Sequence, residues 1–185
     1  MFVGLTVEQE AGIFLELNDF TQVSAFSKFK NAVTNDRPAE TDINRIVLAN
    51  GLVISRESTR DDSISCVSAL TRVYRRAGAQ VFAQDVRIAR DAYGKPGFKS
   101  PVIDGLGLLC ARYNGQLQEG DAIEKLGGVR GGVNGLLGRA QTIRKATDAS
   151  LSEAVAAAAV DIINVGRPNN VKLQPWFKGR AKRSP

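Results

Sequence analysis

The stretch ISCVSALTRVYRRA, residues 64–77, has the most informative pattern in this chain of 185 residues. Its large apolar side chains recur at the spacing of one helix face: Val67, Leu70, Val73 and Tyr74. Short hydroxyl and basic side chains fall on the opposite side: Ser65, Ser68, Arg72, Arg75 and Arg76. The stretch therefore predicts an amphipathic helix that ends at Gly78, with an apolar back packed inward and a basic front exposed to solvent.

Helix signals continue on both sides of this stretch. Thr6 and Gln9 form one capping-box pattern, and Ser150 and Glu153 form another ahead of an alanine-rich run. Further helices are predicted over residues 7–18, 24–34, 38–50, 79–93, 100–113, 121–126, 135–147 and 150–165. The expected fold class is mainly α, a multi-helix bundle with a helix-turn-helix-like element. A short N-terminal strand over residues 2–5 and another within residues 52–63 are possible.

The absence of histidine limits the chemistry that this chain can perform. Neither a Ser–His nor a Cys–His nucleophile can be built, and neither can a zinc site of the usual kind. Cys66 and Cys110 are each flanked by apolar residues, so we expect two buried free thiols in a reducing compartment. We therefore expect no catalytic site, no metal and no cofactor in this chain.

No apolar run is long enough to predict a transmembrane helix, and the N-terminus lacks the pattern of a secretory signal. We accordingly expect a cytoplasmic protein that does not bind membranes. We divide the chain into a helical domain over residues 1–166 and a basic tail over residues 167–185. Within the helical domain, residues 36–94 form the helix-turn-helix-like region and residues 95–166 form the C-terminal helices.

The net charge of +6 is unevenly distributed. All of the excess follows Asp161, and no acidic residue accompanies the six basic residues from Arg167 onward. The segment KLQPWFKGRAKRSP places Trp176 and Phe177 among basic side chains: Lys178, Arg180, Lys182 and Arg183. Such a tail can follow a nucleic-acid backbone while its aromatic rings stack on bases. Alternatively, Trp176 docks on the domain and the charges only improve solubility.

The basic front of residues 64–77 suits a DNA groove. Arginine can grip guanine edges with two hydrogen bonds, and serine can hold phosphates. Residues 38–50 would be the packing partner of this helix, as in a widened helix-turn-helix, although the connection of about a dozen residues exceeds the usual 3–4. The alternative is a solvated basic face on an ordinary core helix.

Two other features are interpreted as structural. The glycine-rich GGVRGGVNG, residues 127–135, lacks the Lys-Ser/Thr that follows in a P-loop, so we interpret it as a flexible connector. The helices at 135–147 and 150–165 are interpreted as core or as an oligomer contact, because the second has acidic but no basic side chains.

The run GLTVEQEAGIFLELN, residues 4–18, resembles a segment of ParB-like proteins of the ParB/sulfiredoxin superfamily. The later runs VSAFSKFK, DINRIVLANGL, ISCVSALTRVYRR and LLGRA are similar, in the same order, to the helical part of phage and actinobacterial members. The resemblance implies that residues 1–35 are a remnant of the nucleotide-binding core. Because this chain has no histidine, the family's phosphate-handling box is missing, and nucleotide binding and hydrolysis are not implied.

Two functions therefore remain open. The first is binding of double-stranded DNA in a regulatory or partition-like role, through the basic front of residues 64–77 and the tail. The second is a protein-interaction module that docks a separate nucleotide-binding subunit, another partner or a second copy through its apolar segment from Phe2 to Phe14. A weaker third possibility is a chain that completes the active site of an enzyme formed with another subunit.

Overall fold

A computed structural model of the chain describes residues 23–57 and 59–177. The described part is mainly helical, as predicted. The α-helices are α2 (Ala25–Thr34), α3 (Pro38–Ala49), α4 (Val67–Tyr93), α5 (Ser100–Arg112), α6 (Glu119–Gly127), α7 (Gly132–Thr147) and α8 (Leu151–Asn164). Two 3-10 turns, η1 (Lys95–Gly97) and η2 (Asn169–Val171), and two short strands, β1 (Val53–Ile54) and β2 (Ser63–Ile64), complete these elements. The strand predicted at residues 2–5 and the helix predicted at 7–18 lie outside the described residues.

The helix starts follow local capping chemistry. The Ser24 side chain accepts a hydrogen bond from the Ser27 amide at the start of α2, and Pro38 occupies the first turn of α3. At the start of α8, Ser150 and Glu153 form the predicted capping box, in which each side chain binds the other's backbone amide. These contacts involve neighbours in sequence, which explains why they could be predicted.

Helix α4 is broken at Gly78, whose backbone angles (φ 81°, ψ 174°) are not helical. The two predicted helices at 64–77 and 79–93 are thus confirmed as the two halves of α4. The predicted start of the first half was wrong, because α4 begins at Val67. Ser63 and Ile64 instead pair in parallel with Val53 and Ile54, which leaves Ser65 in the connection between strand and helix.

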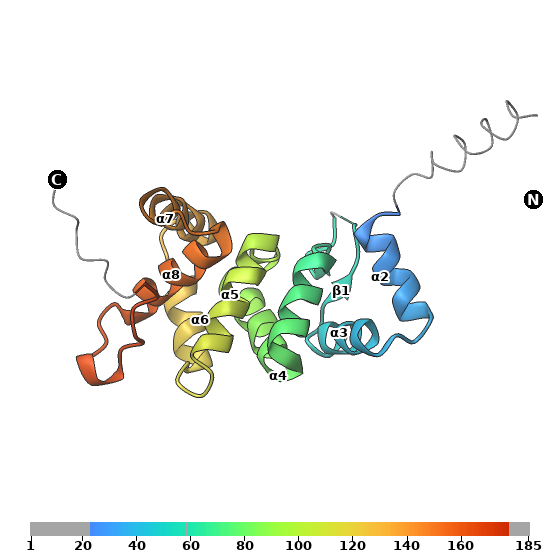
Figure 1. Ribbon diagram of the computed structural model, residues 1–185, viewed down its shortest axis with the longest axis horizontal. Coiled ribbons are helices and arrows are strands. Elements are labelled where there is room, and N and C mark those ends of the chain that lie inside the picture. The colour runs from blue at the N-terminus through green and yellow to red at the C-terminus, as the bar shows by residue number, and fades with distance from the viewer. Residues whose placement is uncertain (1–22, 58, 178–185) are drawn as a thin grey trace, which may run out of the picture.

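Helix α5 is the centre of the core, with α4 on one side and α8 on the other (Figure 1). Two glycines allow this close packing. A Cβ atom at Gly107 would lie 2.6 Å from Cγ1 of Val73 in α4, and one at Gly105 would lie 2.5 Å from Cγ1 of Val155 in α8. The alanine-rich face of α8 is buried against α5 and α7, so its prediction as core is consistent with the structure.

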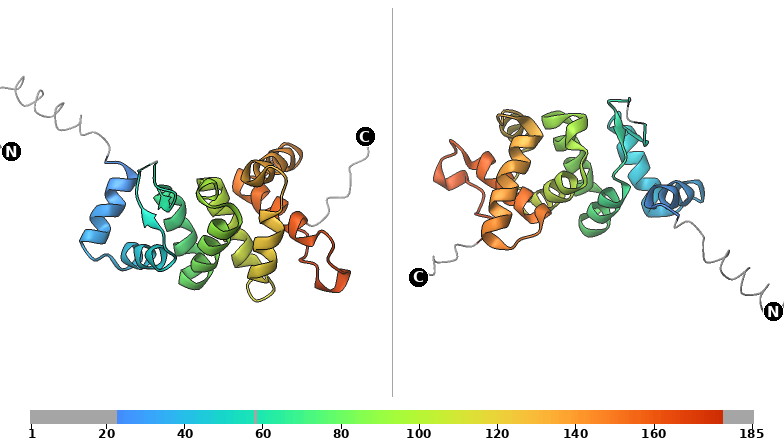
Figure 2. Two further views of the ribbon diagram at one scale, coloured as in Figure 1. Left: turned by 180° about the vertical axis from the view of Figure 1, so that it is seen from behind. Right: turned by 90° about the horizontal axis from the view of Figure 1, so that it is seen from above.

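The helices are arranged in sequence along an elongated body (Figures 1 and 2). Helices α2 and α3 lie at one end, α4 and α5 in the middle, and α6, α7 and α8 toward the other end. Helix α7 lies on the outside of α8. Among the described residues, no helix is long and apolar enough to cross a membrane.

Residues 167–177 fold back onto the helices. Leu173 is buried, and the Asn164 side chain binds both its amide and its carbonyl group at 2.8 Å. The Tyr113 hydroxyl donates to the carbonyl oxygen of Gln174. This part of the predicted tail is therefore docked on the helical body.

Candidate nucleic-acid interface

The first half of α4 presents the predicted two-sided pattern. Val67, Leu70 and Val73 are buried. The hydroxyl and basic residues of the predicted front are exposed: Ser65, Ser68, Arg72, Arg75 and Arg76. Because Ser65 precedes the helix, the continuous polar line on α4 starts at Ser68.

Arg72 is bound to a carboxylate of the neighbouring helix. Its Nε and Nη2 atoms donate to the two carboxylate oxygens of Asp104 in α5, at 3.1 and 2.6 Å. Asp104 is buried, with 7% of its surface exposed, whereas 55% of the Arg72 side chain remains exposed. Arg76 makes a long contact of 3.4 Å to the Asp104 carbonyl oxygen. These contacts join α4 to α5.

Arg75 is bound to the other neighbour of α4. Its Nη2 atom donates at 2.8 Å to Glu40, a buried carboxylate in the first turn of α3. The Tyr74 hydroxyl, next in sequence to Arg75, donates at 2.7 Å to Asp42, and this bond, together with Arg45, lowers the pKa of the Asp42 carboxyl group. Helices α3 and α4 are thus joined by two polar contacts.

The predicted basic front is exposed to solvent, but Arg72 and Arg75 in it are bound to acidic partners. Asp104 and Glu40 are desolvated by the packing of α5 and α3, and a buried carboxylate is stable as an anion only beside a compensating cation. Arg72 and Arg75 satisfy this requirement from the solvent side. They hold helices together and are only partly available for an external ligand.

A groove of about 390 Å³ lies beside these arginines, between α2, α3 and α4. Ser68, Thr71 and Arg72 line it from α4, Lys28 lines it from α2, and Arg37 lines it from the residue before α3. The side chains of Lys28 and Arg37 have no ion-pair or hydrogen-bond partner within the described part of the chain. Neither residue could be identified from the sequence, because nothing in the spacing of residues 24–50 indicates that these cations meet α4.

The connection between α3 and α4 is longer than expected. It covers residues 50–66 and contains both strands, whereas a helix-turn-helix joins its helices by 3–4 residues. The described geometry of this region therefore differs from a standard helix-turn-helix.

Trp176 packs on the body of the protein. The Arg112 guanidinium lies 4.6 Å from its ring centre, and the Tyr113 ring lies 6.3 Å away. Arg112 also donates to the Trp176 carbonyl oxygen at 2.7 Å. Of the two alternatives for this side chain, the structure shows docking. Lys178, Arg180, Lys182 and Arg183 lie outside the described residues.

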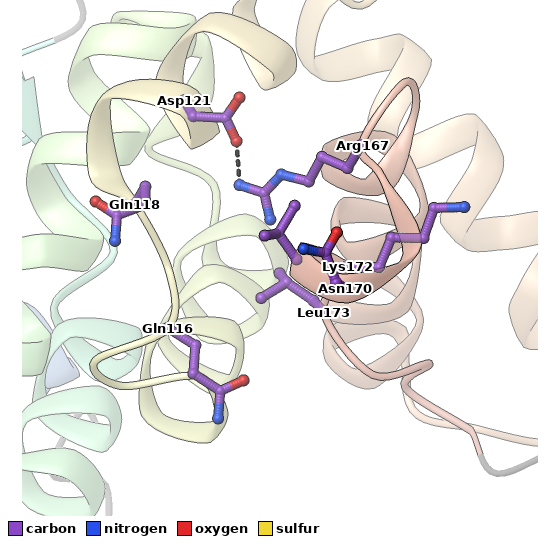
Figure 3. A pocket seen from close by; sticks show the side chains of 8 residues that line it. Gln116, Gln118, Asp121, Arg167, Asn170, Lys172 and Leu173 are labelled. Atoms are coloured by element: carbon purple, nitrogen blue, oxygen red, sulfur yellow. Dashed lines mark hydrogen bonds and ion pairs between the residues drawn. The ribbon is translucent and has the colours of Figure 1, made fainter.

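A second depression, of about 550 Å³, lies between the loop before α6 and the C-terminal segment (Figure 3). Arg167 and Asp121 form an ion pair across it. Side-chain amides from both sides line the rest: Gln116, Gln118 and Asn170. The ion pair attaches residues 167–173 to α6.

Asp85, in the second half of α4, is fully buried, and its two carboxyl oxygens have no hydrogen-bond partner among the described residues. Burial raises the pKa of this carboxyl group well above its usual value, and the negative charge of Asp104 adds to the effect. Burial also raises the pKa of the nearby Cys66 thiol to about 12. Cys66 and Cys110 are both free, and Cys110 is buried as expected, whereas Cys66 is only partly buried.

The fold and this surface define a mainly helical protein with a cationic groove at one end of its helix array. Residues 1–133 match the family described as "Family of unknown function (DUF6551)", and the chain belongs to this family. No curated protein and no solved structure matches the chain. The similarity to ParB-like proteins and the expectation that the chain is not an enzyme remain predictions.

Proposed function

We propose that this protein binds double-stranded DNA through the sugar–phosphate backbone, at the groove between α2, α3 and α4. The observation behind the proposal is the surplus of cations around this groove. Three basic residues line it, Lys28, Arg37 and Arg72, and Arg75 lies beside it through its ion pair with the lining residue Glu40. Two carboxylates lie among them, Glu40 and Asp104, and each is already paired with an arginine, Arg75 and Arg72 respectively. A surface with such a surplus attracts phosphates without regard to sequence.

The ion pairs favour contacts to phosphates over contacts to bases on this surface. Arg72 uses its Nε and Nη2 atoms for Asp104, so this edge of the guanidinium is not available for a two-point contact with guanine. Lys28 and Arg37 are exposed and are the cations best placed to meet a phosphate. The groove also exposes the Ser68 side chain, which can donate to a phosphate oxygen.

The experiment is a fluorescence-anisotropy titration of a labelled duplex of arbitrary sequence at several salt concentrations. We expect affinity to fall steeply with salt, because each neutralised phosphate releases counterions. The variant Lys28→Glu/Arg37→Glu should lose most of the affinity and have a smaller salt slope. This variant is preferable to Arg72→Ala, which would also leave Asp104 without its partner.

The matched control is Arg60→Glu/Lys172→Glu, which changes the net charge equally at exposed sites in the β1–β2 connection and near the C-terminus. It should bind DNA more tightly than the groove variant. Equal losses in both variants, or no binding by the unmodified chain at low salt, would contradict the proposal.

A protein-interaction module is the second candidate function, and the ion pairing of Arg72 and Arg75 favours it, since these arginines already have partners within the fold. The apolar segment from Phe2 to Phe14 that would dock a partner lies outside the described residues. A chain that binds no DNA but self-associates or captures a nucleotide-binding subunit would support this candidate. A regulatory or partition-like role and a cytoplasmic location are part of this proposal. The resemblance to ParB-like proteins, which suggests that role, is likewise part of it.

A further inference from the structure

Helices α6 and α7 are joined by only four residues, 128–131. This is the length of the turn in a helix-turn-helix motif, in which the second helix enters a DNA groove. The turn falls within the glycine-rich stretch that the sequence analysis interpreted as a flexible connector. The predicted connector is confined to residues 128–131, because Gly127 ends α6 and Gly132 begins α7, so residues 132–135 are helical.

The glycines make this turn tight. Gly131 has a φ of 84°, which side-chain-bearing residues rarely adopt. A Cβ atom at Gly135 would lie 2.3 Å from the carbonyl oxygen of Arg130. The turn therefore folds back on the first turn of α7, and this contact fixes the direction in which α7 leaves it.

One side of α7 is anchored in the core, and the other is open. Val133, Leu136 and Ala140 are buried, and the helix packs mainly on α8. Because these residues recur at helical spacing, the opposite side faces away from the body. In Figures 1 and 2, α7 lies on the outside of the helix array.

The open side of α7 is polar and basic. Its exposed residues are Asn134, Gly138, Arg139, Gln141, Thr142, Arg144, Lys145 and Ala146. No acidic residue occurs in α7, and Asp148 follows only at its C-terminal cap. In the described structure, Arg144 and Lys145 have no ion pair, and Asn134 has only a long contact of 3.5 Å with Lys99. This contrasts with the front of α4, where Arg72 and Arg75 are bound to carboxylates.

We propose that α7 is a DNA-reading helix that lies in the major groove. Asn134 and Gln141, two turns apart, would form hydrogen bonds with base edges, for which amides are suited through paired contacts to adenine. Arg144, Lys145 and Arg130 of the turn would meet the flanking phosphates. The 16 residues of α7 span about 24 Å, and an α-helix fits the width of the major groove. This inference rests on the proposed function and adds sequence preference to it.

The test is selection of bound duplexes from a random-sequence library by the full chain. We expect the unmodified chain to enrich one short motif. Asn134→Ala/Gln141→Ala should lose about ten- to a hundredfold of the preference for that motif, and its affinity for arbitrary DNA should be unchanged. The matched control Gln116→Ala/Asn170→Ala removes two exposed amides near the C-terminal segment and should retain the motif.

The outcomes separate the two proposals. Binding without any enriched motif, or the same motif in the α7 variant, overturns the role of α7 and leaves the groove as a non-specific backbone site. Loss of binding to all duplexes in the groove variant, together with an enriched motif in the unmodified chain, supports both. If the unmodified chain binds no duplex, both are overturned, and an acidic protein surface becomes the partner that fits α7.

Discussion

Replacing Asp85 by asparagine tests whether a carboxyl group without a partner is held neutral inside this fold. The side chain is fully buried, and neither oxygen has a hydrogen-bond donor among the described residues. Burial and the charge of Asp104 raise its pKa, and the charge of Arg76 opposes them. Asparagine has the same shape and no titrating proton, so the exchange removes ionisation and little else.

The sign of the effect follows from proton linkage. In the unfolded chain, the carboxyl group ionises near its usual pKa of 3.8, whereas in the folded chain it remains protonated to a higher pH. The folded state therefore binds the extra proton between these two pKa values, and the free energy of unfolding falls as pH rises through that window. The slope is about 1.4 kcal/mol per pH unit. Asp85→Asn has no carboxyl group at this position, so its free energy of unfolding does not fall for this reason. As pH rises, it should therefore become more stable relative to the unmodified chain.

The assay is urea unfolding of both proteins at several pH values between about 4.5 and about 7. Effects of other carboxyl groups, such as that of Asp42, are common to both proteins and cancel in the difference. Asp91→Asn is the matched control. A hydrogen bond from Arg90 lowers the pKa of Asp91, so this group titrates below the assayed pH range. The difference in free energy of unfolding between Asp91→Asn and the unmodified chain should therefore not change with pH. A flat difference for Asp85→Asn would refute the reasoning, since it would mean that Asp85 is ionised in the fold.

Three further predictions concern packing and ion pairs. Gly105→Ala should lower the free energy of unfolding by about 1–3 kcal/mol, because the new Cβ atom would lie 2.5 Å from Val155 and 2.8 Å from the Ser152 carbonyl oxygen. The control is Gly120→Ala, whose new Cβ atom meets open space. It should raise the free energy of unfolding by up to about 1 kcal/mol in the same denaturation assay. Arg72→Ala should lower the free energy of unfolding by about 1–2 kcal/mol, because it leaves the buried Asp104 without its partner. Arg45→Ala breaks an exposed pair, so in parallel urea titrations it should lower the free energy of unfolding by less than about 0.5 kcal/mol. Arg112→Ala should release Trp176, the single tryptophan, and increase acrylamide quenching of its fluorescence; unchanged quenching would contradict the docking.

Much of the fold could be predicted because its signals are local. The start of α2 at Ser24, the break at Gly78 and the capping box at Ser150 each depend on residues within one helical turn. The prediction failed where distant strands intervened. Ile64 has the apolar character of a helix face, yet it pairs with Ile54 in the small sheet, so α4 begins three residues later than predicted.

The candidate sites, too, could be predicted from the sequence only in part. The exposed front of α4 follows from periodicity, and the structure confirms the burial of Val67, Leu70 and Val73. The connector predicted over the glycine-rich residues 127–135 is shorter than expected, because glycine occurs both in long connections and in tight turns. Only the approach of Gly135 to the Arg130 carbonyl oxygen distinguishes the two.

The amino-acid sequence by itself determined which segments are helices, which side of each is apolar, and that histidine chemistry is absent. Only the tertiary structure decided which cations have partners. Arg72 meets Asp104 and Arg75 meets Glu40 across 32 and 35 residues of chain, whereas Arg144 and Lys145 on α7 meet no carboxylate in the described structure. The physical reason is that periodicity orients a side chain about its own helix axis, and the packing of neighbouring helices determines which charge lies opposite it.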